Sequence, residues 1–321
     1  MKVGVAFDSV DLALEAERLG ADMIWTAEYW GHDAHTPLAY LAAKTSRIRL
    51  GTAITQIGAR TPAMLAMASM SLQSLSGGRF VLGLGVSGPQ VMEGWHGVRF
   101  ASPLASTRET INIVRRISAG ERLDHHGKVY TLPLPDSAGK AIRSLAPPVH
   151  VPIYVAALGP KNLELTGELA DGWIGNAFMP ESADVFLGPL RKAGRTLDLV
   201  APVAVEFTDD VSEVGRKHAA GYAFTIGAMG SSSRNFYNEA FTRQGFDVTE
   251  VQRLWAAGDR DAARAAVPIE IGLRTNLIGT REMIAERVKA YEAVGVTSLL
   301  VKLDGPLDHR VSTLAQLMEL M

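Results

Sequence analysis

The chain contains no cysteine among its 321 residues. Disulfides, a thiol nucleophile and thiolate metal sites are therefore excluded. A protein without disulfides is typical of reducing compartments, so we expect a cytoplasmic protein. No apolar run reaches the roughly 18 residues of a membrane-spanning helix, and Asp8 interrupts the N-terminal stretch too early for a signal-peptide core. We therefore expect neither membrane insertion nor secretion.

An excess of charge of one sign is also missing. Lys and Arg number 32 and Asp and Glu number 34, which gives a formal net charge of -2. Nucleic-acid binding needs a clustered positive surface, and the sequence has no long basic run, so this class of partner is disfavoured. The 47% hydrophobic content instead supports a large buried core. We expect a globular protein that acts on a small molecule.

Short apolar runs alternate with amphipathic helical patterns along the whole chain. Gly20 and Gly295 each follow such a helical pattern and are typical helix C-terminal signals. This alternation predicts βα units and a parallel sheet. Its extent favours one (β/α)8 barrel domain over residues 1–321, with a doubly wound sheet as the alternative. The predicted strands lie within residues 23–26, 46–54, 77–86, 153–158, 173–174, 200–208 and 298–303.

Two segments interrupt the alternation. Residues 121–150 are polar and proline-rich, which indicates a hairpin-like insertion or a lid at a strand end. Residues 227–274 form a second insertion that is mostly helical, with amphipathic patterns at Phe236–Phe241 and Val251–Val267. Within it, the run Gly230-Ser231-Ser232-Ser233 predicts a flexible hinge.

The loop after the predicted strand 23–26 combines acidic, aromatic and imidazole groups. In a barrel, functional groups lie on loops after the C-terminal ends of strands. Glu28 is a possible general acid or base, and His32 or His35 a proton shuttle near neutral pH. The alternative is a solvated loop with aromatic core anchors. The spacing of the two histidines also fits a metal, but no third ligand is evident, so no metal is predicted.

The strand within residues 46–54 ends in small residues, which let a flat ligand approach the backbone. Thr61 and Pro62 then open a helix as N-cap and first residue. The alternative is a plain loop before a capped helix. In that helix Met64, Met67 and Met70 recur at helical spacing, which predicts core packing.

The residues LGLGVSGP contain the spacing GxGxxG at Gly83, Gly85 and Gly88. A dinucleotide-binding fold needs this motif in its first βα unit, with an acidic residue at the end of the next strand. Here the motif follows earlier strands, and the residues about 20 positions later look helical. We therefore reject the dinucleotide interpretation and expect a backbone-lined binding loop.

The stretch ALGPKN, from Ala157 to Asn162, joins a strand to a helix. Pro160 suits the first helical position because its missing N–H would have no partner there. The unpaired N–H groups and positive dipole of a helix start attract a phosphate or another anion, and Lys161 adds a positive charge. The alternative is a tight turn without a ligand.

Together these motifs resemble a known family. ALGPKNLELTGELADGWIGN, LGLGVSGPQVMEGWHG and GTREMIAERVKAYEAVGVTSLLV resemble the bacterial-luciferase-like superfamily of flavin and deazaflavin oxidoreductases. Within it, they are most similar to actinobacterial enzymes that use coenzyme F420, an 8-hydroxy-5-deazaflavin. The resemblance covers essentially the whole chain. It implies a (β/α)8 barrel with insertions, a cofactor across the C-terminal face of the barrel, and a homodimer.

The resemblance also implies roles for individual residues. The cofactor phosphate is expected at the helix start around Gly159, and a non-proline cis peptide bond is expected near Ala53-Ile54. Gly85 and the two residues after it are expected to line the ring and ribityl chain. The cofactor-binding residues implied in this way are Ala53, Ile54, Thr55, Gly85, Val86, Ser87, Ala157, Leu158, Gly159 and Asn176.

The chain departs from the sugar-phosphate dehydrogenases of this family. Those enzymes have an Asp-His pair where this chain has Glu28-Tyr29, and a Glu in the loop where it has Ser87-Gly88. Two groups of that chemistry are missing, so we do not expect a glucose-6-phosphate dehydrogenase.

The resemblance favours hydride transfer between the deazaflavin C5 and a small organic substrate, in a direction that the sequence leaves open. Glu28, Tyr29 or His32 is expected to exchange the substrate proton. Two alternatives remain: an FMN-dependent monooxygenase, and a non-catalytic cofactor-binding barrel. The aromatic residues expected to wall the pocket are Trp25, Trp30 and Trp95.

Overall fold

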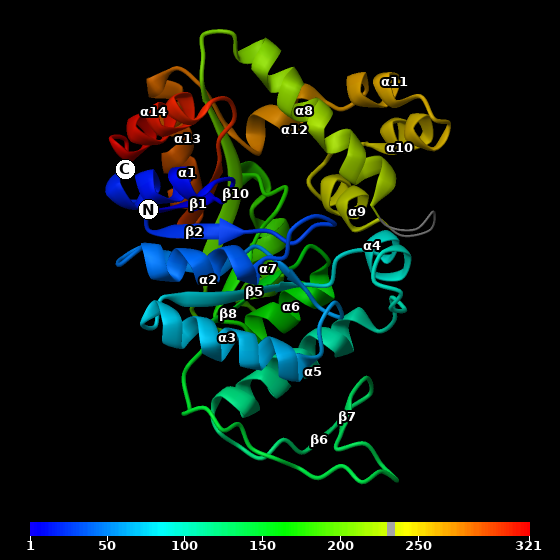
Figure 1. Ribbon diagram of the computed structural model, residues 1–321. Helices are drawn as coiled ribbons and strands as arrows, with labels where there is room; N and C mark the ends of the chain where they lie inside the picture. The colour runs from blue at the N-terminus through cyan, green and yellow to red at the C-terminus, as the bar shows by residue number, and fades with distance from the viewer. Residues whose placement is uncertain (230–234) are drawn as a thin grey trace.

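A computed structural model describes residues 1–229 and 235–321. Within these ranges, eight parallel strand positions close into a barrel (Figure 1). The predicted hinge at Gly230–Ser233 lies outside the described residues. In order around the barrel, the strands are β1 (Lys2–Ala6), β2 (Met23–Thr26), β3 (Arg49–Thr52) with β4 (Thr55–Gln56), β5 (Phe80–Gly85), β8 (Ile153–Ala156), β9 (Gly172–Ile174), β10 (Asp198–Phe207) and β12 (Ser298–Lys302).

Strand β10 closes the barrel. Its residue Val200 pairs in parallel with Ile174 of β9 on one side and with Ser298 of β12 on the other. A short strand, β11 (Leu277–Gly279), adds to the free end of β10 outside the ring. The predicted (β/α)8 barrel is confirmed, and the doubly wound alternative is wrong, since an open sheet would leave two unpaired edges.

Helices surround the barrel because each carries one apolar face that packs on the strands. Thr61 caps α3 as predicted, since its hydroxyl oxygen accepts a hydrogen bond from Met64 N at 3.2 Å. The helices that follow barrel strands are α1 (Val10–Arg18), α2 (His35–Lys44), α3 (Pro62–Ser76), α4 (Pro89–Gly94), α5 (Pro103–Ser118), α6 (Pro160–Leu169), α7 (Asp184–Arg191), α8 (Val211–Ala228), α13 (Arg281–Ala293) and α14 (Leu307–Met318). A 3-10 turn, Pro180–Ser182, precedes α7.

The barrel interior is filled by side chains from alternate positions of the strands. The fully or nearly buried residues there are Met23, Trp25, Val81, Tyr154, Ile174, Val200 and Leu300. This packed layer is the floor on which the C-terminal loops build a site. No helix of the described ranges is long and apolar enough to cross a membrane.

The segment 121–150 does contain a hairpin, formed by β6 (His125–His126) and β7 (Thr131–Leu132). It follows α5 and leads into the N-terminal end of β8, and Figure 1 shows it at the end of the molecule away from α9. Glu109 of α5 holds the hairpin turn by accepting hydrogen bonds from the backbone N–H groups of residues 128–130. None of residues 121–150 lines the cavity at the C-terminal ends of the strands, so the hairpin is not a lid on that site.

The second insertion is helical, as predicted. It contains α9 (Phe236–Arg243), α10 (Thr249–Ala256), α11 (Arg260–Ala265) and α12 (Ile269–Arg274). The pattern expected to run from Val251 to Val267 is interrupted at Gly258, whose φ of +86° ends α10. A further expectation is wrong: Met70 is buried, but Met64 and Met67 are exposed on α3, because the strip they form faces away from the barrel.

Candidate active site

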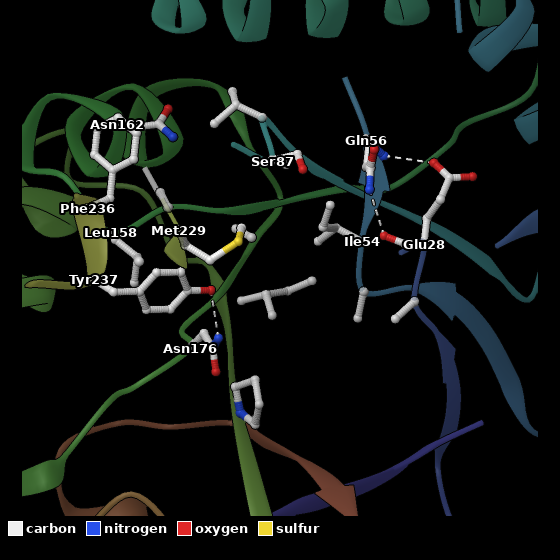
Figure 2. Close-up of a pocket in the computed structure, with 18 of the residues that line it drawn as sticks. Glu28, Ile54, Gln56, Ser87, Leu158, Asn162, Asn176, Met229, Phe236 and Tyr237 are labelled. Carbon is white, nitrogen blue, oxygen red and sulfur yellow. Dashed lines mark hydrogen bonds between the residues drawn. The ribbon is translucent and has the colours of Figure 1, made fainter. Parts of the chain in front are cut away.

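A cavity of about 650 Å³ opens at the C-terminal ends of the strands. Its walls come from the loops after β2, β5 and β8, from the β3–β4 junction and from α9 (Figure 2). Most side chains that line it are apolar, with a few polar groups among them. This arrangement is typical of a pocket for a largely apolar or aromatic ligand.

One wall is made by the junction between β3 and β4. The peptide bond between Ala53 and Ile54 is cis, at the position that the family resemblance implied. Ala53 N donates to Thr26 O at 2.6 Å, and Ile54 O accepts from Glu28 N at 3.1 Å. These bonds to the β2 side leave the Ile54 side chain directed into the cavity (Figure 2).

The neighbouring strand β5 presents backbone to the same wall. A Cβ atom on Gly85 would lie 2.9 Å from two carbon atoms of the Ile54 side chain, so the glycine lets Ile54 lie flat against β5. Ser87 follows with a positive φ of 59° and also lines the cavity. The wall can therefore receive a planar ring against small residues and one isoleucine.

The start of α6 forms the end of the cavity near α9. Its N-cap residue Gly159 gives no side-chain cap, and the helix begins with Pro160. Asn162 lines the cavity, and its Oδ1 atom is buried without a hydrogen-bond partner among the described residues. Arg243 of α9 holds the preceding turn by donating to Leu158 O at 2.7 Å. An uncapped ten-residue helix with Lys161 in its first turn fits a phosphate group.

A hydrogen bond crosses the cavity wall between β9 and α9. Asn176 Nδ2 donates to the Tyr237 hydroxyl oxygen at 3.0 Å (Figure 2). Burial raises the pKa of Tyr237, so the hydroxyl keeps its proton at neutral pH. That proton is free to be donated to a ligand.

On the opposite side, Glu28 is held by several partners. Its carboxylate accepts a hydrogen bond from Gln56 N at 3.0 Å and pairs with Arg60 at 2.6 Å. The Gln56 side chain donates to Glu28 O at 2.9 Å, and its Oε1 lies 2.9 Å from His96 Nε2. Each carboxylate oxygen therefore has a partner, so the arrangement fixes Gln56 at the cavity wall.

His35 lies next to this network at the start of α2. Its ring is buried, packs near Phe80, and neither ring nitrogen has a hydrogen-bond partner. Burial, followed by the charge of Arg60, lowers the pKa of His35 to about 4. The ring is neutral at physiological pH and belongs to the packing beneath the loop, not to the cavity lining.

The cavity also contains a lysine. Lys302 is the last residue of β12 and follows Leu300 by two positions, so both side chains point into the barrel. The side chain is exposed to the open cavity, and desolvation by the surrounding protein lowers the pKa of Lys302. Within residues 1–229 and 235–321, its ammonium has neither a hydrogen bond nor an ion pair.

Most of the predicted site residues meet in this cavity. Glu28 and Tyr29 line it, whereas His32 is exposed outside the lining. Thr55 is fully buried behind the wall and does not line the cavity. Trp95 is also exposed away from it. The predicted cofactor residues that do line it are Ala53, Ile54, Gly85, Val86, Ser87, Ala157, Leu158, Gly159 and Asn176.

Sequence reasoning missed Gln56, Tyr237 and Lys302. A signal existed for Lys302, because a lone charge ends the apolar strand SLLVK at the end where barrel sites lie. Gln56 similarly is a polar residue at a strand end. No sequence signal pointed to Tyr237, because α9 lies much later in the chain than most of the residues that line the cavity with it.

Groups of three or more His, Cys, Asp or Glu side chains that could hold a metal ion do not occur among the residues that the structure describes. The cavity instead fits an organic cofactor. The start of α6 suits a phosphate group, and the wall formed by Ile54 and Gly85 suits a flat ring.

Comparison with solved structures gives the same architecture. The coenzyme F420-dependent tetrahydromethanopterin reductase from Methanopyrus kandleri superposes with a TM-score of 0.78, at 21% identity, over 99% of this chain and 97% of that chain. Identity at this level shows the shared fold.

Two curated relatives match along most of the sequence. A candidate coenzyme F420-dependent oxidoreductase of Mycobacterium tuberculosis is 38% identical over 91% of this chain and 89% of its own. The 5,10-methylenetetrahydromethanopterin reductase of Methanolobus tindarius is 29% identical over 94% of this chain and 93% of its own. The family model described as luciferase-like monooxygenase matches residues 5–298. With the barrel, the cis peptide bond and the cavity in place, this match shows that the chain belongs to the luciferase-like monooxygenase family.

Proposed function

We propose that this protein is a coenzyme F420-dependent oxidoreductase that transfers a hydride between the deazaflavin and a small organic substrate. The observation that carries the proposal is the pairing, in one cavity, of an uncapped helix start with a flat wall of Ile54 and Gly85. The choice of deazaflavin rests on the relative at 38% identity, which carries that cofactor in its name.

The residues that would hold the cofactor come from both parts of this cavity. Gly159 and Lys161 would hold the phosphate, since unpaired N–H groups and an ammonium meet there. Ile54, Gly85 and Ser87 would support the ring. The bound deazaflavin would supply the hydride-accepting or hydride-donating carbon, and the protein would supply position and a dry site.

Other side chains around the cavity would exclude water, bind the substrate or position their neighbours. Trp25, at the floor, and Trp30, at the mouth, help exclude water from the reacting groups. Tyr237 keeps its proton and is positioned by Asn176, so it can donate a hydrogen bond to a substrate oxygen. Glu28 positions Gln56 through its paired carboxylate.

The proton that accompanies hydride transfer is assigned to Tyr29 in this proposal. Of the three residues first considered, Tyr29 lines the cavity and is 65% exposed at its mouth. Glu28 also lines it, but its carboxylate oxygens are engaged, and His32 stands outside. Tyr29→Phe should therefore lower kcat with a confirmed substrate by at least about tenfold, with cofactor affinity unchanged. An unchanged kcat would instead favour Glu28 as the residue that exchanges the substrate proton.

The direct test is a titration of the purified protein with the deazaflavin and, separately, with FMN, followed by cofactor fluorescence. We expect saturable binding of the deazaflavin and weaker binding of FMN. Preference for FMN, with dioxygen consumption in the presence of reduced FMN, would support a monooxygenase instead. Binding of neither cofactor would contradict a phosphate site at the helix start around Gly159. Tight binding without exchange of label from the reduced cofactor to any substrate would support a non-catalytic cofactor-binding barrel.

We also propose a homodimer. Apolar side chains are exposed along α2 and α3, at Tyr40, Met64, Met67 and Leu75. Such a patch on a helical face is typical of a protein interface. Sedimentation of the wild type against Met64→Glu with Met67→Glu tests this, and two monomeric proteins would contradict it.

A further inference from the structure

Among residues 1–229 and 235–321, the cation Lys302 has no counter-charge in the cavity. The acidic group on the β2 side of the cavity, Glu28, is already paired. Leu300 and Lys302 project from the same face of β12, and Ala204, the register partner of Lys302 on β10, offers no polar atom from its side chain. No carboxylate in the described ranges pairs with the lysine. A ligand that covers this lysine without supplying an anion would leave the ammonium desolvated and unpaired.

The described acidic residues that line the cavity are Glu28 and Glu239, and neither forms an ion pair with Lys302. Glu239 lies on α9 and interacts with Arg243 of the same helix. Glu28 is neutralised by Arg60 at 2.6 Å. Glu206 lies on β10, two positions after Ala204. It pairs with Lys217 at 2.7 Å and with His218 at 2.6 Å. Lys217 also pairs with Asp304 at 2.9 Å, just beyond Lys302 in sequence. The acidic groups around the end of β12 therefore already have cationic partners.

The position of Lys302 separates it from the expected cofactor groups. It ends β12, which lies beside β1 and β10, whereas Ile54, Gly85 and Gly159 come from β3–β4, β5 and the loop after β8. These two sets of strands lie on different arcs of the barrel. Leu300, two positions before Lys302 on β12, and its register partner Pro202 on β10 line the cavity on the Lys302 side.

We propose that the substrate is a small organic acid whose carboxylate binds the Lys302 ammonium while its apolar part lies over Leu300 and Pro202. This deepens the proposed function, on which it rests, by naming the substrate class. A ligand that fills the cavity would exclude solvent from both charges, which would strengthen this charge-assisted hydrogen bond relative to one in water. The same exclusion also makes the pocket reject uncharged analogues, which would leave the ammonium unpaired.

The test uses hexanoate and hexanamide as probes, because they have the same apolar chain and differ in charge. Binding to the full-length protein without cofactor is followed by titration calorimetry. We expect hexanoate to bind at least about tenfold more tightly than hexanamide. Equal affinities, or no saturable binding of hexanoate, would overturn the proposal.

Variants then assign the preference to one residue. K302M removes the charge and keeps an apolar stem, so hexanoate should bind no better than hexanamide. K302R keeps the charge and should keep the preference. K289M, on the exposed face of α13, is the matched control and should behave as wild type. If K302M does not fold, K302Q replaces it. A preference that survives in the neutral variants would overturn the proposal.

Titration of the same variants with the deazaflavin separates this inference from the proposed function. Unchanged deazaflavin affinity in K302M, with the hexanoate preference lost, supports a substrate site. Lost deazaflavin affinity in K302M, with no hexanoate preference in the wild type, would assign Lys302 to the cofactor and overturn the inference. A wild type that binds no deazaflavin but prefers hexanoate through Lys302 would refute the proposed function and leave the acid site standing.

Discussion

Parts of the cavity differ in whether their polar groups have partners within the described protein. On the β2 side, Glu28, Gln56 and Arg60 satisfy one another within hydrogen-bond distance. In two other places, the start of α6 and the end of β12, the first turn of α6 has no side-chain cap and the Lys302 ammonium has no partner in the described part of the chain.

This difference separates structural groups from ligand-binding groups. A buried polar group that finds its partner inside the protein stabilises the fold, whereas one left open costs stability unless a ligand completes it. Changes on the β2 side should therefore reduce stability, and changes on the α6 side should reduce ligand binding with little loss of stability. The following variants test this division.

Arg60→Met should have the largest effect. It removes the cation beside Glu28, whose side chain is 6% exposed, and leaves the carboxylate buried with one partner fewer. We expect the free energy of unfolding, measured by urea denaturation at neutral pH, to fall by about 3 kcal/mol. Adding Glu28→Gln should recover part of this loss. A change below about 1 kcal/mol would show that the pair behaves as a surface ion pair.

His35→Leu should change the pH dependence of stability. The pKa of His35 is about 4 in the folded protein and 6.5 as its ordinary value, so between these pH values the unfolded chain binds a proton that the folded chain excludes. Stability contributed by the neutral ring is complete above pH 6.5 and is lost as the pH falls towards 4. The loss at pH 5 amounts to about 2 kcal/mol.

The measurement compares denaturation of wild type and His35→Leu at pH 7 and pH 5. Between pH 7 and pH 5, we expect the free energy of unfolding of the wild type to fall by the amount linked to His35. His35→Leu should not show this loss. His32→Gln, at the exposed neighbouring histidine, is the control for a local charge change. Parallel losses in wild type and His35→Leu would contradict a buried, neutral His35.

Gly159→Asp should separate stability from binding on the α6 side. Gly159 has φ -74° and ψ 143°, and a Cβ there meets nothing within 4 Å. Aspartate is a better N-cap than glycine, so stability should rise by about a few tenths of a kcal/mol. The carboxylate would occupy and repel the phosphate position, and deazaflavin affinity should fall at least about tenfold. Gly159→Ala is the uncharged control; equal affinity in Gly159→Asp and wild type would place the phosphate elsewhere.

Gly85→Ala should have a modest effect on both stability and binding. The new Cβ would lie 2.9 Å from the Ile54 side chain, which must shift by a few tenths of an ångström. We expect a loss of about 1 kcal/mol in the free energy of unfolding and weaker deazaflavin binding. Ile54→Val in the same background should restore part of the stability. An unaffected affinity would show that the ring does not contact this wall.

Much of the fold was predictable from local patterns. The strand Met23–Thr26 and the helix start at Thr61-Pro62 follow directly from apolar runs, capping residues and turn signals. The nine predicted cofactor residues that line the cavity were implied by the family resemblance, and the closed barrel brings together the strand ends at which they lie. Met64 and Met67 were misplaced because helical spacing indicates a face but not which neighbour that face meets.

The sequence by itself determined the alternation of strands and helices, and hence the end of the barrel where a site forms, because these depend on local periodicity and on turn residues. Tertiary structure alone decided which polar groups are satisfied. Glu28 meets Arg60, 32 positions later in the chain, while Lys302 meets no carboxylate in the described residues. Partners of this kind are fixed by the closure of the barrel, so a strand-end charge becomes either a structural pair or a ligand site only once the fold is complete.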